Sequence, residues 1–240
     1  MQKLLLKIRL SAFFWIFLLT YIALSFAIPH TKFESAALTL FSVNSLLYGF
    51  YIAPILAAQK SRIEELHKIV RAEANALFAM ALSSNLFNDV DHKKTMQLLT
   101  SYAEKVYKNK RIGAGEHEYE ELIRSMITRE DQSSEATKKM LDQLIANQTN
   151  RSNLALQMAN KVFSNEWWII LVLFSISISF VLLLEIGSSP FLNIVRALLC
   201  TGLSMLLLIL IKLTTLTHKK AKLMWQPLGK LIDSKFYRID

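Results

Sequence analysis

The 240-residue sequence contains one cysteine, four prolines and six glycines. A single cysteine excludes a disulfide within the chain, and the scarcity of proline and glycine leaves few points at which a helix would break. The five histidines are scattered, with no two spaced i, i+4 and no cysteine pair beside them, which disfavours a zinc site. Gly113-Ala114-Gly115 is not followed by the Lys-Ser/Thr pair of a phosphate-binding loop. We therefore expect no metal, no cofactor, no catalytic residues and no enzymatic activity.

Long apolar runs are abundant in this sequence. Two pairs of them, 11–29 with 36–58 and 167–185 with 191–211, flank a polar block at 59–166. At about 1.5 Å per residue, each run can cross a hydrocarbon core of about 30 Å. The pattern predicts an all-α polytopic membrane protein, with four transmembrane helices in a 2+2 arrangement around a helical insert.

The first run has an alternative interpretation as a cleaved signal peptide. Lys3, Lys7 and Arg9 precede it, and Ser25-Phe26-Ala27 has the small-x-small pattern of a cleavage site. We favour a retained membrane helix. Both alternatives leave the second run entering the membrane from outside.

Basic residues gather on one side of the predicted spans. Three of them precede the first span, and four follow each of the second and fourth spans, whereas the turn at 186–190 has none and that at 30–35 has only Lys32. Because cytoplasmic flanks collect Lys and Arg, we expect both termini and residues 59–166 in the cytosol and the spans in the inner membrane. The tryptophans near these span ends are expected to anchor the membrane interface: Trp15, Trp167, Trp168 and Trp225.

The formal net charge of +9 lies mostly beside the membrane. Residues 59–166 hold 16 bases and 15 acids, a net charge of only +1. We expect the excess to face an anionic inner leaflet, at about 1 kcal/mol per base near the surface, and we expect no nucleic-acid partner. The basic, amphipathic tail 212–240 resembles an interfacial helix, with a loose regulatory tail as the alternative; its apolar residues are Leu228, Leu231, Ile232 and Phe236.

The block 59–166 predicts helices throughout, because its apolar residues recur at spacings of three and four. One stripe is expected to extend span two into a long helix, with Pro54 as a site for a bend and a turn at 85–89 as its end. The members of this stripe are Ile63, Leu66, Val70, Leu77 and Ala81.

Three more helices are expected after this turn. The second helix of the block is capped by Asp91 and stops before Gly113. The third carries acids in its first turns, where they complement the helix dipole, and is expected to bury Leu122, Ile123, Met126 and Ile127. The fourth is expected to run into span three without a break, along the stripe Leu141, Leu144, Ile145, Ala155, Met158 and Val162.

We expect the charged residues of the long helix and of the span ends to lie at surfaces. Glu64, Glu65 and Glu73 share a helix with three bases and are expected to form solvated ion pairs. Glu185, Arg196 and Lys212 lie at span ends, where snorkelling to the interface is expected.

Span two carries the largest number of polar residues. One of its faces, formed by Phe41, Asn44, Tyr48 and Tyr51, is predicted to line a pore at an oligomer axis. The small residues Ser42, Ser45 and Gly49 form another face, which is predicted to pack against a neighbouring helix. The alternative is that both faces pack.

The layout of two spans, a helical insert and two further spans resembles the bestrophin-like membrane proteins. Local similarities are Arg71-Ala-Glu-Ala-Asn-Ala-Leu77 after span two, Tyr102 with Val106, and Arg151 followed by Trp167-Trp168. The resemblance implies an oligomeric ion pathway lined by span two. The acidic calcium clasp of bestrophin channels has no counterpart in this sequence, so calcium gating is not implied.

Two functions are therefore expected. The first is an oligomeric bestrophin-like channel for anions. The alternative is a non-conducting membrane scaffold or sensor that acts through its cytosolic helical domain on an unidentified protein partner. In both, the chain divides into 1–58, 59–166, 167–211 and 212–240.

Overall fold

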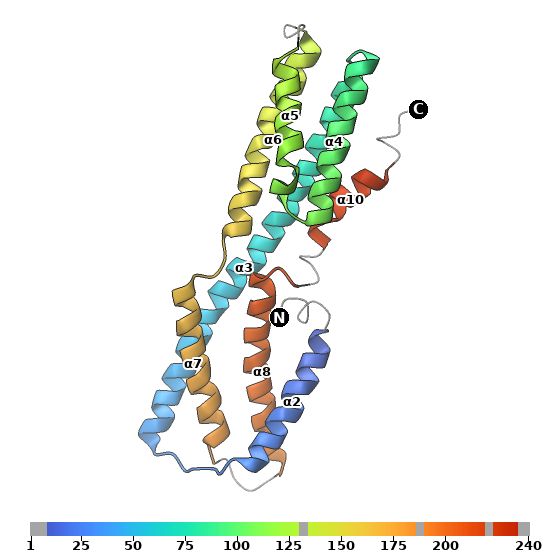
Figure 1. Cartoon of the computed structure of the whole chain (residues 1–240). Coiled ribbons are helices and arrows are strands. Elements are labelled where there is room, and N and C mark those ends of the chain that lie inside the picture. Colours follow the sequence, from blue (N-terminus) through green and yellow to red (C-terminus); the bar gives the residue numbers. More distant parts are fainter. Residues whose placement is uncertain (1–8, 130–133, 186–189, 219–222, 235–240) are drawn as a thin grey trace. The chain divides into compact units, whose positions relative to one another are not determined.

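The computed structural model describes residues 9–129, 134–185, 190–218 and 223–234. The chain divides into two units, which we call the first and the second unit (Figure 1). The first consists of Met1–Ser61 with Lys161–Lys219, and the second of Arg62–Asn160 with Lys220–Asp240.

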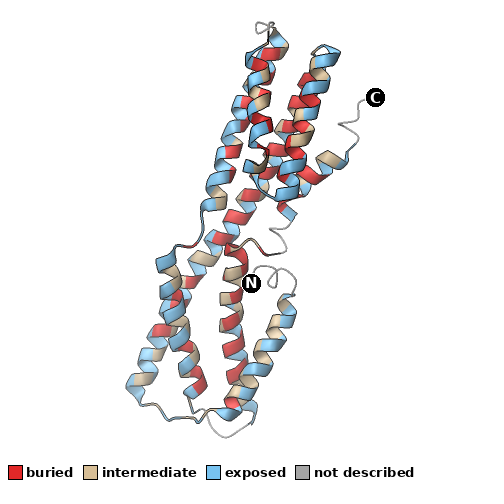
Figure 2. Ribbon diagram, in the orientation of Figure 1, coloured by how far each residue is buried: buried red, intermediate tan, exposed pale blue. Residues whose placement is uncertain are grey.

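The first unit is a bundle of membrane-type helices: α2 (Leu10–Ala27), the beginning of α3 (Ser35–Ser84), α7 (Ser164–Leu183) and α8 (Pro190–Thr214). Four stretches are long and apolar enough to cross a membrane, the third of them within Glu135–Leu183. Each of the four predicted spans overlaps one of these stretches. Figure 2 shows many buried residues along α8, while the residues of α2 are exposed or half-buried apart from Ser25.

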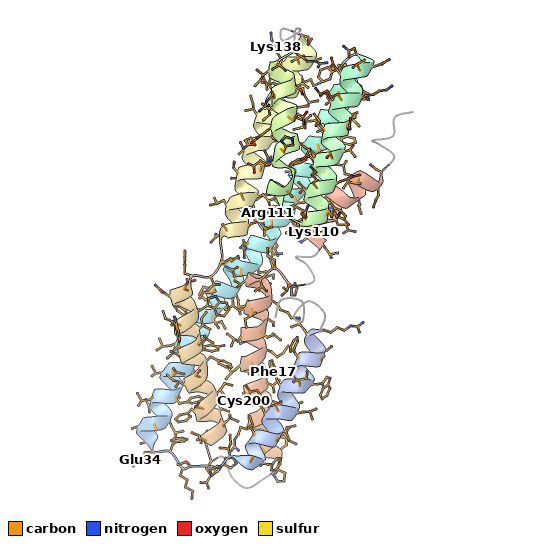
Figure 3. The ribbon with its side chains drawn as sticks, in the orientation of Figure 1. Phe17, Glu34, Lys110, Arg111, Lys138 and Cys200 are labelled. Atoms are coloured by element: carbon orange, nitrogen blue, oxygen red, sulfur yellow. The ribbon has the colours of Figure 1, made fainter. Side chains whose placement is uncertain are left out.

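Span one is an integral part of this bundle. α2 packs along α8, where the Tyr21 hydroxyl lies 2.7 Å from the Ser204 hydroxyl. Nearby, Cys200 of α8 (Figure 3) lies in a buried cluster with Val181 and Leu182 of α7. The retained helix stays a prediction.

The loops that follow spans one and three lie side by side. Thr31 and Leu184 form a parallel bridge, in which the Thr31 N–H donates to Leu183 O at 2.8 Å and the Glu185 N–H donates to Thr31 O at 3.1 Å. The two loops therefore share one end of the first unit, as expected if both face the same side of a membrane. Residues 186–189 of the second turn lie outside the described residues.

α3 is one helix from Ser35 to Ser84 and contains Pro54. Its predicted stripe is buried, because Ile63, Leu66, Val70, Leu77 and Ala81 are each at most 2% exposed. The turn expected at 85–89 separates α3 from α4 (Asp89–Asn109). The cap of α4 differs from the prediction: Asn88 accepts the hydrogen bond from the Asp91 N–H at 2.9 Å, so Asn88 and not Asp91 caps the helix.

The second unit adds further elements to the end of α3 and to α4. These are η1 (Ile112–Gly115), α5 (Glu116–Ile127), α6 (Glu135–Ala159), η2 (Leu223–Trp225) and α10 (Gln226–Asp233). The predicted buried face of α5 is partly wrong, since Ile127 is 52% exposed while Glu118 and Tyr119 are buried.

The predicted face of α6 is also shifted. Ile145 is 62% exposed, whereas Asn147 and Arg151 are buried together with Met140, Leu144 and Leu154. The shift arises because the face that packs includes two polar residues, which a search for apolar periodicity passes over.

The long helix predicted through residue 166 is two helices. α6 ends at Ala159 and α7 begins at Ser164. The Glu166 carboxylate accepts a hydrogen bond from the Phe163 N–H at 2.9 Å, which satisfies a free donor at the start of α7. Val162, in the connection, is buried in a first-unit cluster with Tyr48, Ile52, Ile170 and Leu210.

The C-terminal segment also differs from the prediction. α10 packs on α4, with Leu228 fully buried, instead of presenting its whole apolar face to lipid. Phe236 lies outside the described residues. The expected interfacial helix is thus a packing element of the second unit over the residues described.

Candidate functional site

The predicted pore face of span two packs within the chain. Asn44 of α3 donates to the Ser177 hydroxyl at 2.9 Å and to Leu173 O at 3.2 Å, both on α7. Phe41 stacks on Phe180 with ring centroids 4.5 Å apart, and Tyr48 is 3% exposed. Tyr51 packs against the same buried cluster as Tyr48. These contacts within the subunit argue against the pore assignment for Asn44 and Tyr48, which are buried, and leave it a prediction for Phe41 and Tyr51, which are half-buried.

The small-residue face of span two, which was predicted to pack against a neighbouring helix, lies on the exposed side of α3. A Cβ atom added at Gly49 would meet nothing within 4 Å, and Ser42 is exposed, while Ser45 is half-buried. Large side chains lie beside these small ones, since Leu46 is 59% and Phe50 71% exposed. This face is the part of span two that is free to meet lipid, another subunit or an aqueous pathway.

Three of the four tryptophans can serve as interface anchors. Trp15 and Trp168 are 60% and 71% exposed, and Trp167 is half-buried. Trp225 is only 3% exposed within the second unit. A ring enclosed by protein does not lie among lipid headgroups, so the anchoring role predicted for Trp225 is wrong.

Two of the charges expected to snorkel are enclosed by the bundle. Arg196 of α8 is fully buried and donates to the His30 ring at 2.8 Å, to Asn193 Oδ1 at 3.1 Å and to Leu184 O at 2.5 Å. Lys212 is 4% exposed, with its ammonium 5.1 Å from the centroid of the Phe13 ring. Glu185 remains near the surface, 3.9 Å from Lys32.

The second unit encloses a polar cluster drawn from four helices. Glu73 of α3 is fully buried and accepts a hydrogen bond from the Tyr102 hydroxyl of α4 at 2.5 Å. Tyr119 of α5 donates to Leu144 O at 2.7 Å, and its ring centroid lies 5.4 Å from that of Tyr102. Glu73 was expected in a solvated ion pair, and its complete burial corrects that prediction.

Arg151 of α6 completes this cluster. Its guanidinium carbon lies 3.8 Å from the centroid of the Tyr119 ring, and Nη1 donates to Gln148 Oε1 at 2.8 Å. Arg151 is 7% exposed. Burial raises the pKa of the Glu73 carboxyl above its ordinary value, and the hydrogen bond from Tyr102 and the charge of Arg151 oppose this effect without reversing it.

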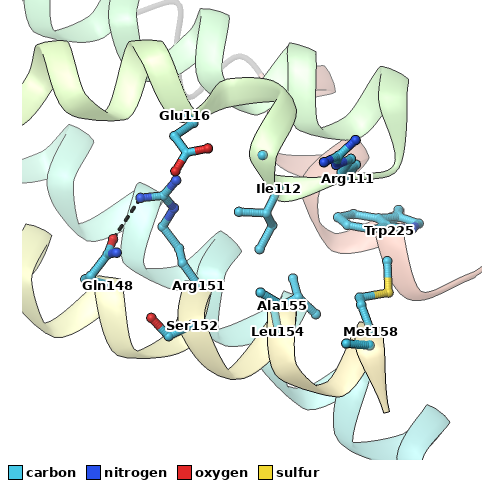
Figure 4. Close-up of a pocket in the computed structure, with 12 residues that line it drawn as sticks. Arg111, Ile112, Glu116, Gln148, Arg151, Ser152, Leu154, Ala155, Met158 and Trp225 are labelled. Carbon is cyan, nitrogen blue, oxygen red and sulfur yellow. Dashed lines mark hydrogen bonds between the residues drawn. The ribbon is translucent and has the colours of Figure 1, made fainter. Parts of the chain in front are cut away.

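A cavity of about 540 Å³ opens beside Arg151. Its lining comes from η1, the first residue of α5, α6 and η2, and Figure 4 shows Arg151 rising from α6 toward Glu116. Among the described residues, no group of three or more His, Cys, Asp or Glu side chains is placed to hold a metal ion.

The cluster contains residues that sequence reasoning assigned to the surface or left without a role. Glu73 falls at a position of the buried α3 stripe, between Val70 and Leu77, and that register was the signal that could have identified its burial. Arg151 holds the same kind of position between Leu144 and Leu154 on α6.

The raised pKa of Glu73 predicts a pH-dependent stability. Folding favours the protonated carboxyl, so its contribution to the free energy of unfolding is present at low pH and is lost as the pH rises from about 4.5 through the folded pKa. Relative to Glu73→Gln, the wild-type chain should lose up to about 1.4 kcal/mol per pH unit in that range. Melting of the full chain by circular dichroism between pH 4 and 8 measures this difference. Glu64→Gln, at an exposed position of the same helix, should follow the wild type; parallel curves for all three proteins would contradict the prediction.

Comparison with known proteins places this architecture in a family. The model of the bestrophin-like domain matches residues 10–219, which include all four spans and most of the second unit. The chain therefore belongs to the bestrophin-like family of membrane proteins. Searches among curated proteins and among solved structures gave no match.

Proposed function

We propose that the chain is one subunit of an oligomeric anion channel, with span two beside the ion pathway. The family match over residues 10–219 is the observation that carries this proposal, because bestrophin-family membrane proteins are often anion channels. The surface of the first unit supports it. Only 6% of the most apolar window of α2 and 11% of that of α3 are buried within the chain.

The exposed face of α3 supplies two kinds of surface. Its small edge, with Ser42 and Gly49, allows another helix to approach closely, as is typical of helix packing in membranes. Leu46 and Phe50 form an adjoining bulky edge that can narrow a pathway by excluding water. We assign the small edge to contact between subunits and the bulky edge to the pathway.

Reconstitution tests the proposal directly. Purified protein in liposomes should release chloride down a gradient when the membrane potential is clamped with potassium and valinomycin, and its mass in detergent should correspond to a ring of several subunits. A monomer, or an oligomer that passes no anion across a range of ionic conditions, would refute it.

Two phenylalanines on opposite faces of α3 give a matched pair of variants. Phe50→Ala should change chloride flux severalfold and leave the melting temperature in detergent unchanged, because Phe50 is 71% exposed. Phe41→Ala should lower the melting temperature, because it removes the stack on Phe180 and leaves a gap, at a cost of about 3 kcal/mol. If the Phe50→Ala variant passes chloride at the wild-type rate, the bulky edge of α3 does not line the ion pathway.

The proposed orientation places the second unit and both termini in the cytosol of an inner-membrane protein. The basic flanks of the spans support this topology. Protease added to intact cells should leave residues 62–160 uncut and should cut them after permeabilisation. Cleavage before permeabilisation would show that the second unit lies outside the cell and would contradict the proposed orientation.

A sensor that does not conduct is the second candidate function, and the cavity beside Arg151 favours it. Oligomers that are electrically silent and that recover a stable soluble protein through the second unit would support this candidate over the channel.

A further inference from the structure

The cavity in the second unit has a charged end and an apolar end. We infer that it binds a small organic carboxylate with an apolar body, a site distinct from any ion pathway beside span two. Its volume of about 540 Å³ falls within the range of about 300–1,000 Å³ that is usual for small-molecule sites.

Arg151 lines the charged end of the cavity. It is 93% buried, and among the described residues no carboxylate oxygen lies within 4.0 Å of its guanidinium nitrogens. Its Nε is buried and lacks a hydrogen-bond partner in the described part of the chain. The Glu73 carboxyl interacts with the charge of Arg151 from beyond 4.0 Å. Burial of a cation that lacks a directly paired anion is costly, and an anion in the adjoining cavity would reduce that cost.

A second arginine makes the charged end selective for anions. Arg111, the residue before η1, lines the cavity, and its Nε lies 3.6 Å from the position that a Cβ at Gly113 would take. Arg111 also has no carboxylate within 4.0 Å among the residues described. Among the described residues that line the cavity, Glu116 is the one acid, so two positive charges face one negative charge. Planar guanidinium groups match the geometry of a carboxylate.

The remaining wall explains why the ligand should be organic. Ile112, Leu154 and Met158 line the cavity together with the indole of Trp225, which is 3% exposed (Figure 4). A thioether and an indole provide favourable contacts for an aromatic or aliphatic group. Inorganic anions would contact the arginines but would leave this apolar wall hydrated.

Calorimetric titration of the full chain in lipid nanodiscs tests the inference, with 3-phenylpropanoate as the probe. Three matched compounds each lack one feature: 3-phenylpropan-1-ol lacks the charge, 3-phenylpropylammonium reverses it, and acetate lacks the apolar body. The carboxylate should bind at least about tenfold more tightly than each of the three. Equal binding of the alcohol, or no binding of the carboxylate above that to empty nanodiscs, would overturn the inference.

Neighbouring cations at the end of α4 supply the matched variants. Arg111 and Lys110 are labelled in Figure 3. Arg111→Gln should weaken binding of the carboxylate about tenfold, whereas Lys110→Gln should not, because Lys110 lies over the Tyr107 ring and is absent from the cavity lining. Both residues are exposed, so neither change should unfold the chain. Arg151→Gln should abolish binding, and bound 3-phenylpropanoate should protect the α6 amides around Ser152 from hydrogen exchange. Equal effects of the Arg111 and Lys110 variants would exclude this cavity. Binding alone is measured, so the result does not depend on whether the protein conducts anions.

Discussion

Gly115→Ala should destabilise the second unit by about 3 kcal/mol, the upper part of the usual cost of overpacking a core. A Cβ at this position would lie 2.5 Å from Cδ2 and 2.9 Å from Cε2 of the Tyr102 ring, and 3.1 Å from Cγ2 of Val106. Tyr102 and Val106 are fully buried. The ring is also held by its hydrogen bond to Glu73, so it cannot move aside without breaking that contact.

The neighbouring glycine provides the control. At Gly113 the nearest atom to an added Cβ is Arg111 Nε at 3.6 Å, an ordinary contact, so Gly113→Ala should change stability by no more than about 0.5 kcal/mol. Hydrogen exchange of the α4 amides in the full chain measures the loss, as a fall in the free energy of local opening. If both variants opened alike, the close packing of Gly115 on Tyr102 would not be a determinant of this core.

The features that could be predicted from sequence are those set by local composition. A run such as 191–211 is apolar over a length that matches the hydrocarbon core, and this property needs no knowledge of neighbouring helices. The turn after α3 and the break between α4 and α5 could be predicted in the same way, because each depends on a short polar or glycine-containing segment.

The faces that pack could not be predicted in the same way. Whether Phe41 or Phe50 of α3 turns inward depends on where α7 supplies Phe180 and Ser177, which lie far away in the sequence. In water the more apolar face of a helix is normally the buried one, but in lipid an apolar face gains nothing by turning inward. Hydrophobicity therefore carries little information about the side of span two that meets the rest of the bundle.

Buried polar residues account for most of the remaining errors. Glu73, Arg151 and Arg196 are charged types that normally lie at surfaces, and each is buried here because nearby groups satisfy part of its polar group. Glu73 accepts from Tyr102 of α4, Arg151 donates to Gln148 of its own helix, and Arg196 donates to the His30 ring in a loop. The break between α6 and α7 has a similar origin. A single side chain, Glu166, bonds to the Phe163 N–H and starts a new helix where the apolar pattern continues.

Arg196→Met should lower the stability of the first unit by about 3 kcal/mol, although it replaces a charge with an apolar side chain of similar length. The substitution leaves Leu184 O and the Asn193 amide oxygen without the donor that they share, and it leaves the His30 ring without its partner. Water is scarce beside a membrane span, so each lost hydrogen bond is replaced poorly. The bridge between Thr31 and Leu184 should loosen at the same time, since Arg196 holds Leu184 by its carbonyl.

Lys32→Met is the matched control at the same end of the bundle. The Lys32 side chain is 84% exposed, and its ammonium lies 3.9 Å from the Glu185 carboxylate, an exposed ion pair of a kind that contributes little. The melting temperature of the purified chain in detergent should therefore fall by several degrees for Arg196→Met and stay within about one degree of wild type for Lys32→Met. Arg196→Lys should give an intermediate value, because an ammonium can reach fewer of the three acceptors than the forked guanidinium. If Met and Lys at position 196 melted alike and near wild type, the three hydrogen bonds of Arg196 would not be what holds the two loops together, and packing of its aliphatic stem would suffice.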